Sequence, residues 1–203
     1  MSFKGLTFHK PSAVYLCTLK SPYMNATNNL PNILAISGSL RPNSSNNTVI
    51  NTAAAMLAGK ANVTIYDGLG RLPHFNDSKE EYTEVTNWRK LLKEADGVLI
   101  CSPEYAFGVP GSLKNALDWT VSSGELVYKP LALITAATGG DKAHAALLNT
   151  LTALSTNVTE DTSLLISYIR SKMSPAGEIT DAATLLSIEK VLSSFLDLIK
   201  TSE

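Results

Sequence analysis

The sequence of 203 residues contains no acidic side chain before Asp67. The first 66 positions carry only five cations, and the rest of the chain holds 12 basic and 18 acidic residues, a net charge of −6. The five early cations are Lys4, Lys10, Lys20, Arg41 and Lys60. Such scattered cations do not form the dense basic stripe of a nucleic-acid binding protein. The charge pattern therefore excludes a nucleic-acid partner.

Long hydrophobic runs and cysteines are also scarce. No apolar run approaches the ~20 residues that a membrane-spanning helix needs, so the sequence excludes an integral membrane protein. Two cysteines, Cys17 and Cys101, cannot make a disulfide framework, and no Cys/His cluster has the spacing of a zinc site. We therefore expect reduced thiols in a cytoplasmic protein that has no bound metal and no membrane partner.

Residues 1–30 are expected to be a poorly ordered N-terminal extension. The apolar stretch at 13–19 follows three basic side chains as in a signal peptide, but it is short and no small-residue cleavage site follows. An organellar leader is a less favoured alternative, because acids are absent and Ser and Thr are frequent, yet no Arg precedes Arg41. Translation from Met24 is a further alternative.

From residue 32 onward, short apolar runs alternate with amphipathic segments, which is typical of a βαβ chain. The predicted strands cover 33–36, 63–66, 97–101, 131–135 and 164–168. The predicted helices cover 46–58, 83–95, 112–121, 142–154 and a terminal segment capped by Asp181. Right-handed crossovers favour a single α/β domain over residues 31–203, a three-layer sandwich whose five-stranded parallel sheet has the order 2-1-3-4-5.

Open parallel sheets bind ligands beyond the carboxyl ends of their strands, so the loops there are the candidate sites. The loop SGSLRPNSSNN (37–47) offers hydroxyls, the guanidinium of Arg41 and the free N–H groups of a helix start near Asn46. These groups suit a phosphate. The chain has no GxxxxGK[ST], no GxGxxG with a following acid and no Cys-x5-Arg, which excludes three rival phosphate sites. A Ser/Asn/Gly turn that only caps the helix explains the loop equally well.

The loop SPEYAFGVPGSLKNALDW (102–119) combines rigidity with aromatic surface. Two prolines and two glycines stiffen it and let its backbone approach a flat ligand, and Tyr105 and Phe107 supply aromatic rings. A flavin ring needs this kind of apolar shelf beside backbone polar groups. The alternative is a helix-entry loop whose aromatic side chains belong to the core.

These two loops and the stretch KPLALITAATGG, in this order and spacing, resemble the NADPH-dependent FMN reductase family of flavodoxin-like proteins, which includes quinone, azo-dye and chromate reductases. The resemblance covers residues 32–200 and implies FMN as the cofactor. It implies that the FMN phosphate is held by Ser39, Arg41, Ser44 and Asn46. It implies that the isoalloxazine contacts Pro103, Glu104, Tyr105, Ala106 and Phe107, and on its third side Ala137, Thr138 and Gly139.

The chain departs from the family pattern at one position. Members usually have Asn after Ser-Pro-Glu-Tyr, and this chain has Ala106. If the protein contacts the ring mainly through backbone groups, the exchange of Asn for Ala is tolerated. If the side-chain amide of Asn tunes the flavin, this chain lacks that contribution. We favour the first interpretation, because Gly108, Pro110 and Gly111 preserve the shape of the loop.

The resemblance implies an NAD(P)H-dependent oxidoreductase. Hydride from NADPH or NADH would pass to flavin N5 and then to a quinone-like acceptor in a ping-pong cycle, with no obligate acid or base from the chain. Azo compounds, free flavin and metal oxyanions are further acceptors. The alternatives are a flavin reductase that supplies reduced FMN, a flavodoxin-like electron carrier and an FMN-based redox sensor. A carrier would usually be more acidic than this chain.

Similar proteins place the flavin face at a dimer interface, so we expect a homodimer or a dimer of dimers through the segment 124–128 and the helix at 112–121. The remaining candidates are weaker. The three histidines, His9, His74 and His144, are dispersed and predict no metal site. Cys101 ends a buried strand and is expected to be a core residue. Glu104 is expected to face solvent or a partner subunit, and a general-acid role is a minor alternative.

Overall fold

The computed structural model describes residues 30–77 and 80–202, so the prediction of a poorly ordered extension falls, except for Leu30, outside the described residues. The strands are β1 (Asn32–Ser37), β2 (Asn62–Tyr66), β3 (Gly97–Ser102), β4 (Leu131–Ala137) and β5 (Ser163–Ser167). The helices are α1 (Ser45–Met56), α2 (Thr83–Glu94), α3 (Gly111–Asp118), α4 (Asp141–Ala153) and α5 (Ala182–Thr201). Short 3-10 turns are η1 (Leu69–Arg71), η2 (Glu160–Thr162) and η3 (Ile169–Lys172).

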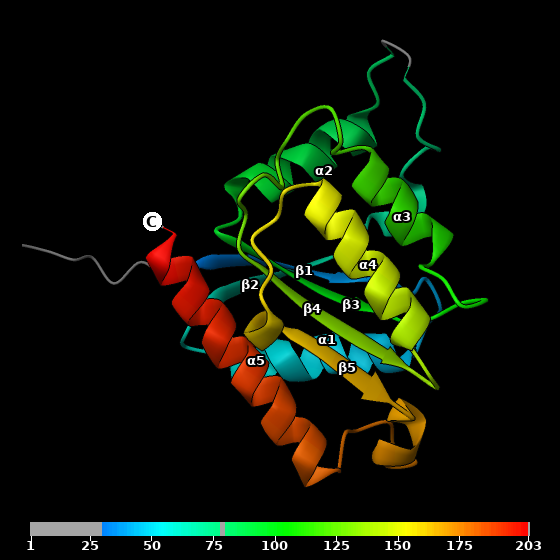
Figure 1. Cartoon of the computed structure of the whole chain (residues 1–203), viewed down its shortest axis with the longest axis vertical. Coiled ribbons are helices and arrows are strands. Elements are labelled where there is room, and N and C mark those ends of the chain that lie inside the picture. Colours follow the sequence, from blue (N-terminus) through cyan, green and yellow to red (C-terminus); the bar gives the residue numbers. More distant parts are fainter. Residues whose placement is uncertain (1–29, 78–79, 203) are drawn as a thin grey trace, which may run out of the picture.

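The five strands form one parallel sheet in the order β2-β1-β3-β4-β5, which confirms the predicted topology. Helices α1 and α5 cover one face of the sheet, and α2, α3 and α4 cover the other (Figure 1). Every residue of β3 and β4 is buried, as the continuous apolar runs of these strands predict. The chain is therefore the expected three-layer α/β sandwich.

Each helix docks through a stripe of apolar side chains at helical spacing. In α2 the stripe contains Val85, Trp88 and Leu92, and the indole N–H of Trp88 donates to the carbonyl of Ala116 at 3.0 Å. In α5, Phe195 is fully buried against the sheet. The carboxyl group of Asp181 accepts the amide of Thr184 at 2.9 Å, so this side chain is the predicted N-cap of α5.

Two boundaries differ from the prediction where the site is built. Helix α3 ends at Asp118 rather than at residue 121, because Thr120 turns back and donates both its amide and its hydroxyl to the carbonyl of Leu117. Strand β4 continues two residues further than predicted, because Ala136 and Ala137 still pair with β5. Ala137 is therefore a buried strand residue and not part of the turn that follows.

None of the helices in the described part of the chain is long and apolar enough to cross a membrane.

Candidate functional site

The loops that follow β1, β3 and β4 meet at the carboxyl edge of the sheet, because these three strands are neighbours. Direct hydrogen bonds join the loops. The amide of Gly38 donates to the carbonyl of Cys101 at 2.8 Å, and the hydroxyls of Ser39 and Tyr105 are 3.2 Å apart. The amide nitrogen of the Asn46 side chain donates to the carbonyl of Ala136 at 3.2 Å. The structure therefore brings the three sequence-predicted loops together.

The loop after β1 carries a cation, Arg41, four residues before the start of α1. Ser44 caps this helix, and its hydroxyl oxygen accepts the amide of Asn46 at 3.2 Å. The first turn has no acidic residue, and the amide of Ser45 has no partner among the described residues. Arg41 is exposed, and no described carboxylate lies within ion-pair distance of it. A helix N-terminus with an uncompensated guanidinium is suited to bind an anion.

The side chain of Asn46 points away from this anion site. It is 3% exposed, it donates to Ala136, and its oxygen accepts the thiol of Cys101 at 3.1 Å. Both the side chain and the backbone amide of Asn46 have partners within the protein, and its contribution to phosphate binding stays a prediction. Sequence reasoning missed the side-chain contacts because the partners lie 55 and 90 positions away in the chain.

The loop after β3 forms a tight hairpin around its aromatic side chains. Tyr105 and Gly108 exchange two backbone hydrogen bonds of 3.0 and 2.9 Å, and the two residues between them, Ala106 and Phe107, have φ angles of 49° and 58°. Positive φ at both central positions is the signature of a type I′ turn. The Phe107 side chain is 79% exposed and Tyr105 is 50% exposed, so the loop presents aromatic surface at the edge of the site. The alternative of core aromatics is wrong.

The turn accounts for the Asn that is usual at position 106 in the family pattern, and it holds Ala106 in a conformation that is strained for Ala. Asn adopts the left-handed region more readily than Ala, and Asn is favoured at the first central position of a type I′ turn. We expect Ala106→Asn to raise the free energy of unfolding by about 0.5–1 kcal/mol, because it relieves backbone strain. Urea denaturation of the FMN-free protein measures this change.

A matched control is available on α4. Ala145 is exposed inside this helix, where Asn is a poorer residue than Ala. The same exchange, Ala145→Asn, is therefore expected to lower the free energy of unfolding by about 0.5 kcal/mol. Equal destabilisation by both substitutions would show that the left-handed conformation at Ala106 carries no measurable strain.

The third loop consists of Thr138, Gly139 and Gly140, of which the first two are exposed. Sequence reasoning missed that the end of β5 supports this loop. The hydroxyl of Ser167 donates to the carbonyl of Gly139 at 3.0 Å, and the amide of Tyr168 donates to the carbonyl of Thr138 at 3.1 Å. Tyr168 itself has φ 56° and a side chain that is 66% exposed. The only sign of this support in the sequence was an aromatic residue, Tyr168, at the end of a predicted strand.

Glu104 does not face open solvent. Its side chain is half-buried, and its Oε2 accepts the amide of Ala143 at 2.9 Å, near the start of α4. Pro103 before it is buried. The loop after β3 is thereby tied to the loop after β4 by Glu104 and to the loop after β1 by Tyr105.

The remaining candidates have structural roles. Cys101 is fully buried, which raises the pKa of its thiol well above the ordinary value and keeps it protonated, as expected of a core residue. His144 lies between the hydroxyls of Thr135 and Ser163, at 2.8 and 3.0 Å, and burial lowers the pKa of its imidazole.

His9 lies outside the described residues. Within residues 30–77 and 80–202, no cluster of His, Cys, Asp and Glu side chains could hold a metal ion.

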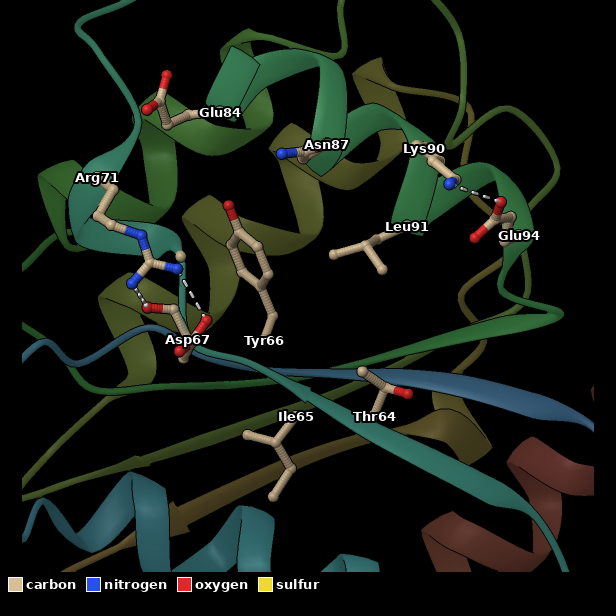
Figure 2. Close-up of a pocket in the computed structure, with 11 residues that line it drawn as sticks. Thr64, Ile65, Tyr66, Asp67, Arg71, Glu84, Asn87, Lys90, Leu91 and Glu94 are labelled. Carbon is tan, nitrogen blue, oxygen red and sulfur yellow. Dashed lines mark hydrogen bonds and ion pairs between the residues drawn. The ribbon is translucent and has the colours of Figure 1, made fainter.

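A separate groove of about 500 Å³ lies between β2, η1 and α2 (Figure 2). Four of its five charged side chains form ion pairs within the groove, and Glu84 is in none of the ion pairs among the described residues. Arg71 and Asp67 are 2.9 Å apart, and Lys90 and Glu94 are 3.8 Å apart. No residue of the three loops lines it, so it is not part of the candidate site.

Comparison with known proteins agrees with the geometry. Residues 31–170 match the sequence profile of the NADPH-dependent FMN reductase family. An NADPH azoreductase of Bacillus sp. (strain OY1-2) is 38% identical over 103 residues, which are 49% of this chain and 57% of that protein. A quinone reductase of Escherichia coli (strain K12) is 29% identical over 178 residues, which are 83% of this chain and 95% of that protein.

A solved structure with the same fold is that of FerB, a flavoenzyme NAD(P)H:(acceptor) oxidoreductase from Paracoccus denitrificans. It has a TM-score of 0.76 and 26% sequence identity, and the match covers 85% of this chain and 98% of that one. The profile match extends over all three loops and all five strands of the sheet. The chain therefore belongs to the NADPH-dependent FMN reductase family, whose members are flavin-dependent oxidoreductases.

Proposed function

We propose that the chain binds FMN across the three loops and transfers electrons in two steps, from NAD(P)H to the flavin and from the flavin to a quinone-like acceptor. The observation that carries this proposal is the exposed Arg41 shortly before α1, which has no carboxylate partner among the described residues and is joined through Ser39 and Tyr105 to an aromatic hairpin. A phosphate site and a ring site then lie side by side, as FMN requires.

The residues present fit FMN at both ends. Ser39, Arg41, Ser44 and the backbone at Ser45 supply donors for a phosphate dianion, and no acid lies in the first turn of α1 to repel it. The hairpin around Ala106 and the exposed turn at Thr138 would flank the ring. Bound FMN supplies the hydride chemistry, so the chain has to position the ring and need not provide an acid or base.

The acceptor is proposed from the site and from the relatives together. The rings of Phe107 and Tyr168 are exposed at the edge of the site and give a flat aromatic acceptor an apolar surface. The relatives named above reduce quinones or azo compounds. Quinones are the first candidate, and the exchange of NAD(P)H for acceptor at one open face corresponds to a ping-pong cycle.

We also propose a homodimer formed through the segment 124–128 and helix α3. Exposed apolar side chains occur in this segment and shortly after α3: Val121 is 64% exposed, Val127 48% and Tyr128 78%. Covering them on association would remove apolar area from water.

The proposal is tested with purified protein loaded with FMN. We expect a yellow protein whose absorbance near 450 nm bleaches with NADPH under anaerobic conditions and returns when menadione is added. Steady-state NADPH oxidation should depend on menadione, with parallel double-reciprocal plots for a ping-pong cycle. Bound FMN without acceptor-dependent turnover would instead identify an electron carrier or a redox sensor. Turnover that only free FMN supports would identify a flavin reductase.

A further inference from the structure

The N-cap position of helix α4 provides no side-chain cap. This N-cap is Gly140, with φ 104° and no side-chain hydrogen bond. The amide of Ala143, the third residue of the helix, is the group that an N-cap side chain ordinarily accepts. Here Glu104 Oε2 accepts it at 2.9 Å from the loop after β3, 39 positions earlier in the chain. A distant loop therefore supplies the cap of α4.

The surroundings of Glu104 match this role. Its carboxylate lies at the positive end of the α4 dipole, and none of the ion pairs among the described residues includes it. A Cβ built on Gly139 would lie 3.6 Å from Glu104 Oε1, so the carboxylate packs beside the backbone of the third loop. Glu104 is thus bonded to the start of α4 and lies beside the loop that leads into it.

Tyr105, the next residue, connects the same loop to the loop after β1. The hydroxyl of Tyr105 lies 3.2 Å from that of Ser39, in the loop after β1, whereas Glu104 reaches the loop after β4. The dipeptide therefore links the central loop to both neighbours, in the order of the strands β1, β3 and β4.

We propose that Glu104 is a positioning residue that fixes the distance between the loops flanking the flavin ring, by capping α4 through Ala143. This inference rests on the proposed FMN site. Glu104 acts only at the end of the site that would hold the flavin ring, whereas Arg41 and the start of α1 act at the phosphate end. Removing the Glu104 bond should therefore weaken binding of any ligand that has the ring, with or without a phosphate.

The test compares Glu104→Ala and Glu104→Gln in binding FMN and riboflavin, measured by quenching of flavin fluorescence. We expect Glu104→Ala to weaken both ligands by the same factor, about 5- to 30-fold, which corresponds to the loss of a helix cap. Glu104→Gln retains an acceptor oxygen and should remain within about threefold of the wild type. Asp141→Ala is the matched control, because it removes an acid from the same helix end without contacting the loop after β3.

Hydrogen exchange of the Ala143 amide in the FMN-free protein provides a readout independent of flavin. It should accelerate in Glu104→Ala and stay near wild type in Glu104→Gln and Asp141→Ala. Faster exchange with unchanged flavin affinity would overturn the positioning role, as would a Glu104→Gln variant as weak as Glu104→Ala. If the wild-type chain itself binds no flavin while the Ala143 amide is protected through Glu104, the proposed function fails and the cap stands.

Discussion

Replacing Arg41 by Ala should weaken FMN binding by about 10- to 100-fold, the usual value of a charge-assisted hydrogen bond. Arg41 has no ion-pair partner in the described part of the chain. Its removal therefore leaves no carboxylate there without its partner and should leave the fold intact. The loss would therefore report on the ligand alone. Titration of the FMN-free protein with FMN, followed by the flavin absorbance, gives the two dissociation constants.

Riboflavin serves as the internal control for Arg41→Ala, because it has the ring of FMN without the phosphate. Its affinity should be the same in the variant and the wild type. The FMN loss should also shrink as salt increases, since salt screens an exposed charge. Equal FMN affinity in both proteins would mean that the loop after β1 only caps α1, and the phosphate would have to be assigned elsewhere.

Phe195→Ala should lower the free energy of unfolding by about 3–5 kcal/mol, the largest effect on stability that we expect from a single substitution. Phe195 is fully buried on α5 and lies against the start of β3. Its ring Cζ is 2.7 Å from the position that a Cβ on Gly97 would occupy, so no space is left between helix and central strand. Since small domains are stable by about 5–15 kcal/mol, urea unfolding should shift markedly.

Two further variants separate packing from other causes. Leu186, on the same helix, is 53% exposed. Leu186→Ala should therefore lower the free energy of unfolding by less than about 1 kcal/mol. Gly97→Ala should be destabilising in the wild type and less so in Phe195→Ala, where the shortened side chain removes one of the two clashes of the added methyl group; the other, with Ile199 Cδ1 at 2.7 Å, remains. An additive double variant would contradict direct packing between these two positions.

The fold was predictable because its determinants are local in sequence. Short apolar runs such as 97–101 are typical of central strands, and the stripe that contains Phe195 on α5 follows helical spacing. The right-handed connections between such elements leave few possible strand orders. The boundary errors at α3 and β4 arose where a side chain such as Thr120, or pairing with β5, decided the end of an element.

The candidate site was predictable only as three loops of unusual composition. What each side chain does there depends on partners far away in the chain. Asn46 turns inward to Ala136, and Glu104 caps a helix that begins 37 positions later, at Asp141. The left-handed backbone at Ala106 is also invisible in the sequence, because Ala and Phe are not typical type I′ residues. The individual roles at the site remain predictions until the variants above are measured.

The inward-turned Asn46 has a consequence for how tightly the chain depends on its cofactor. Asn46, Ser44 and Glu104 already have hydrogen-bond partners within the protein, and no buried side-chain N or O among the described residues lacks one. The buried side chains at this edge of the sheet thus need no ligand to satisfy them. We therefore expect the FMN-free chain to be folded and ready to rebind, so that flavin behaves as an exchangeable ligand rather than as a structural element.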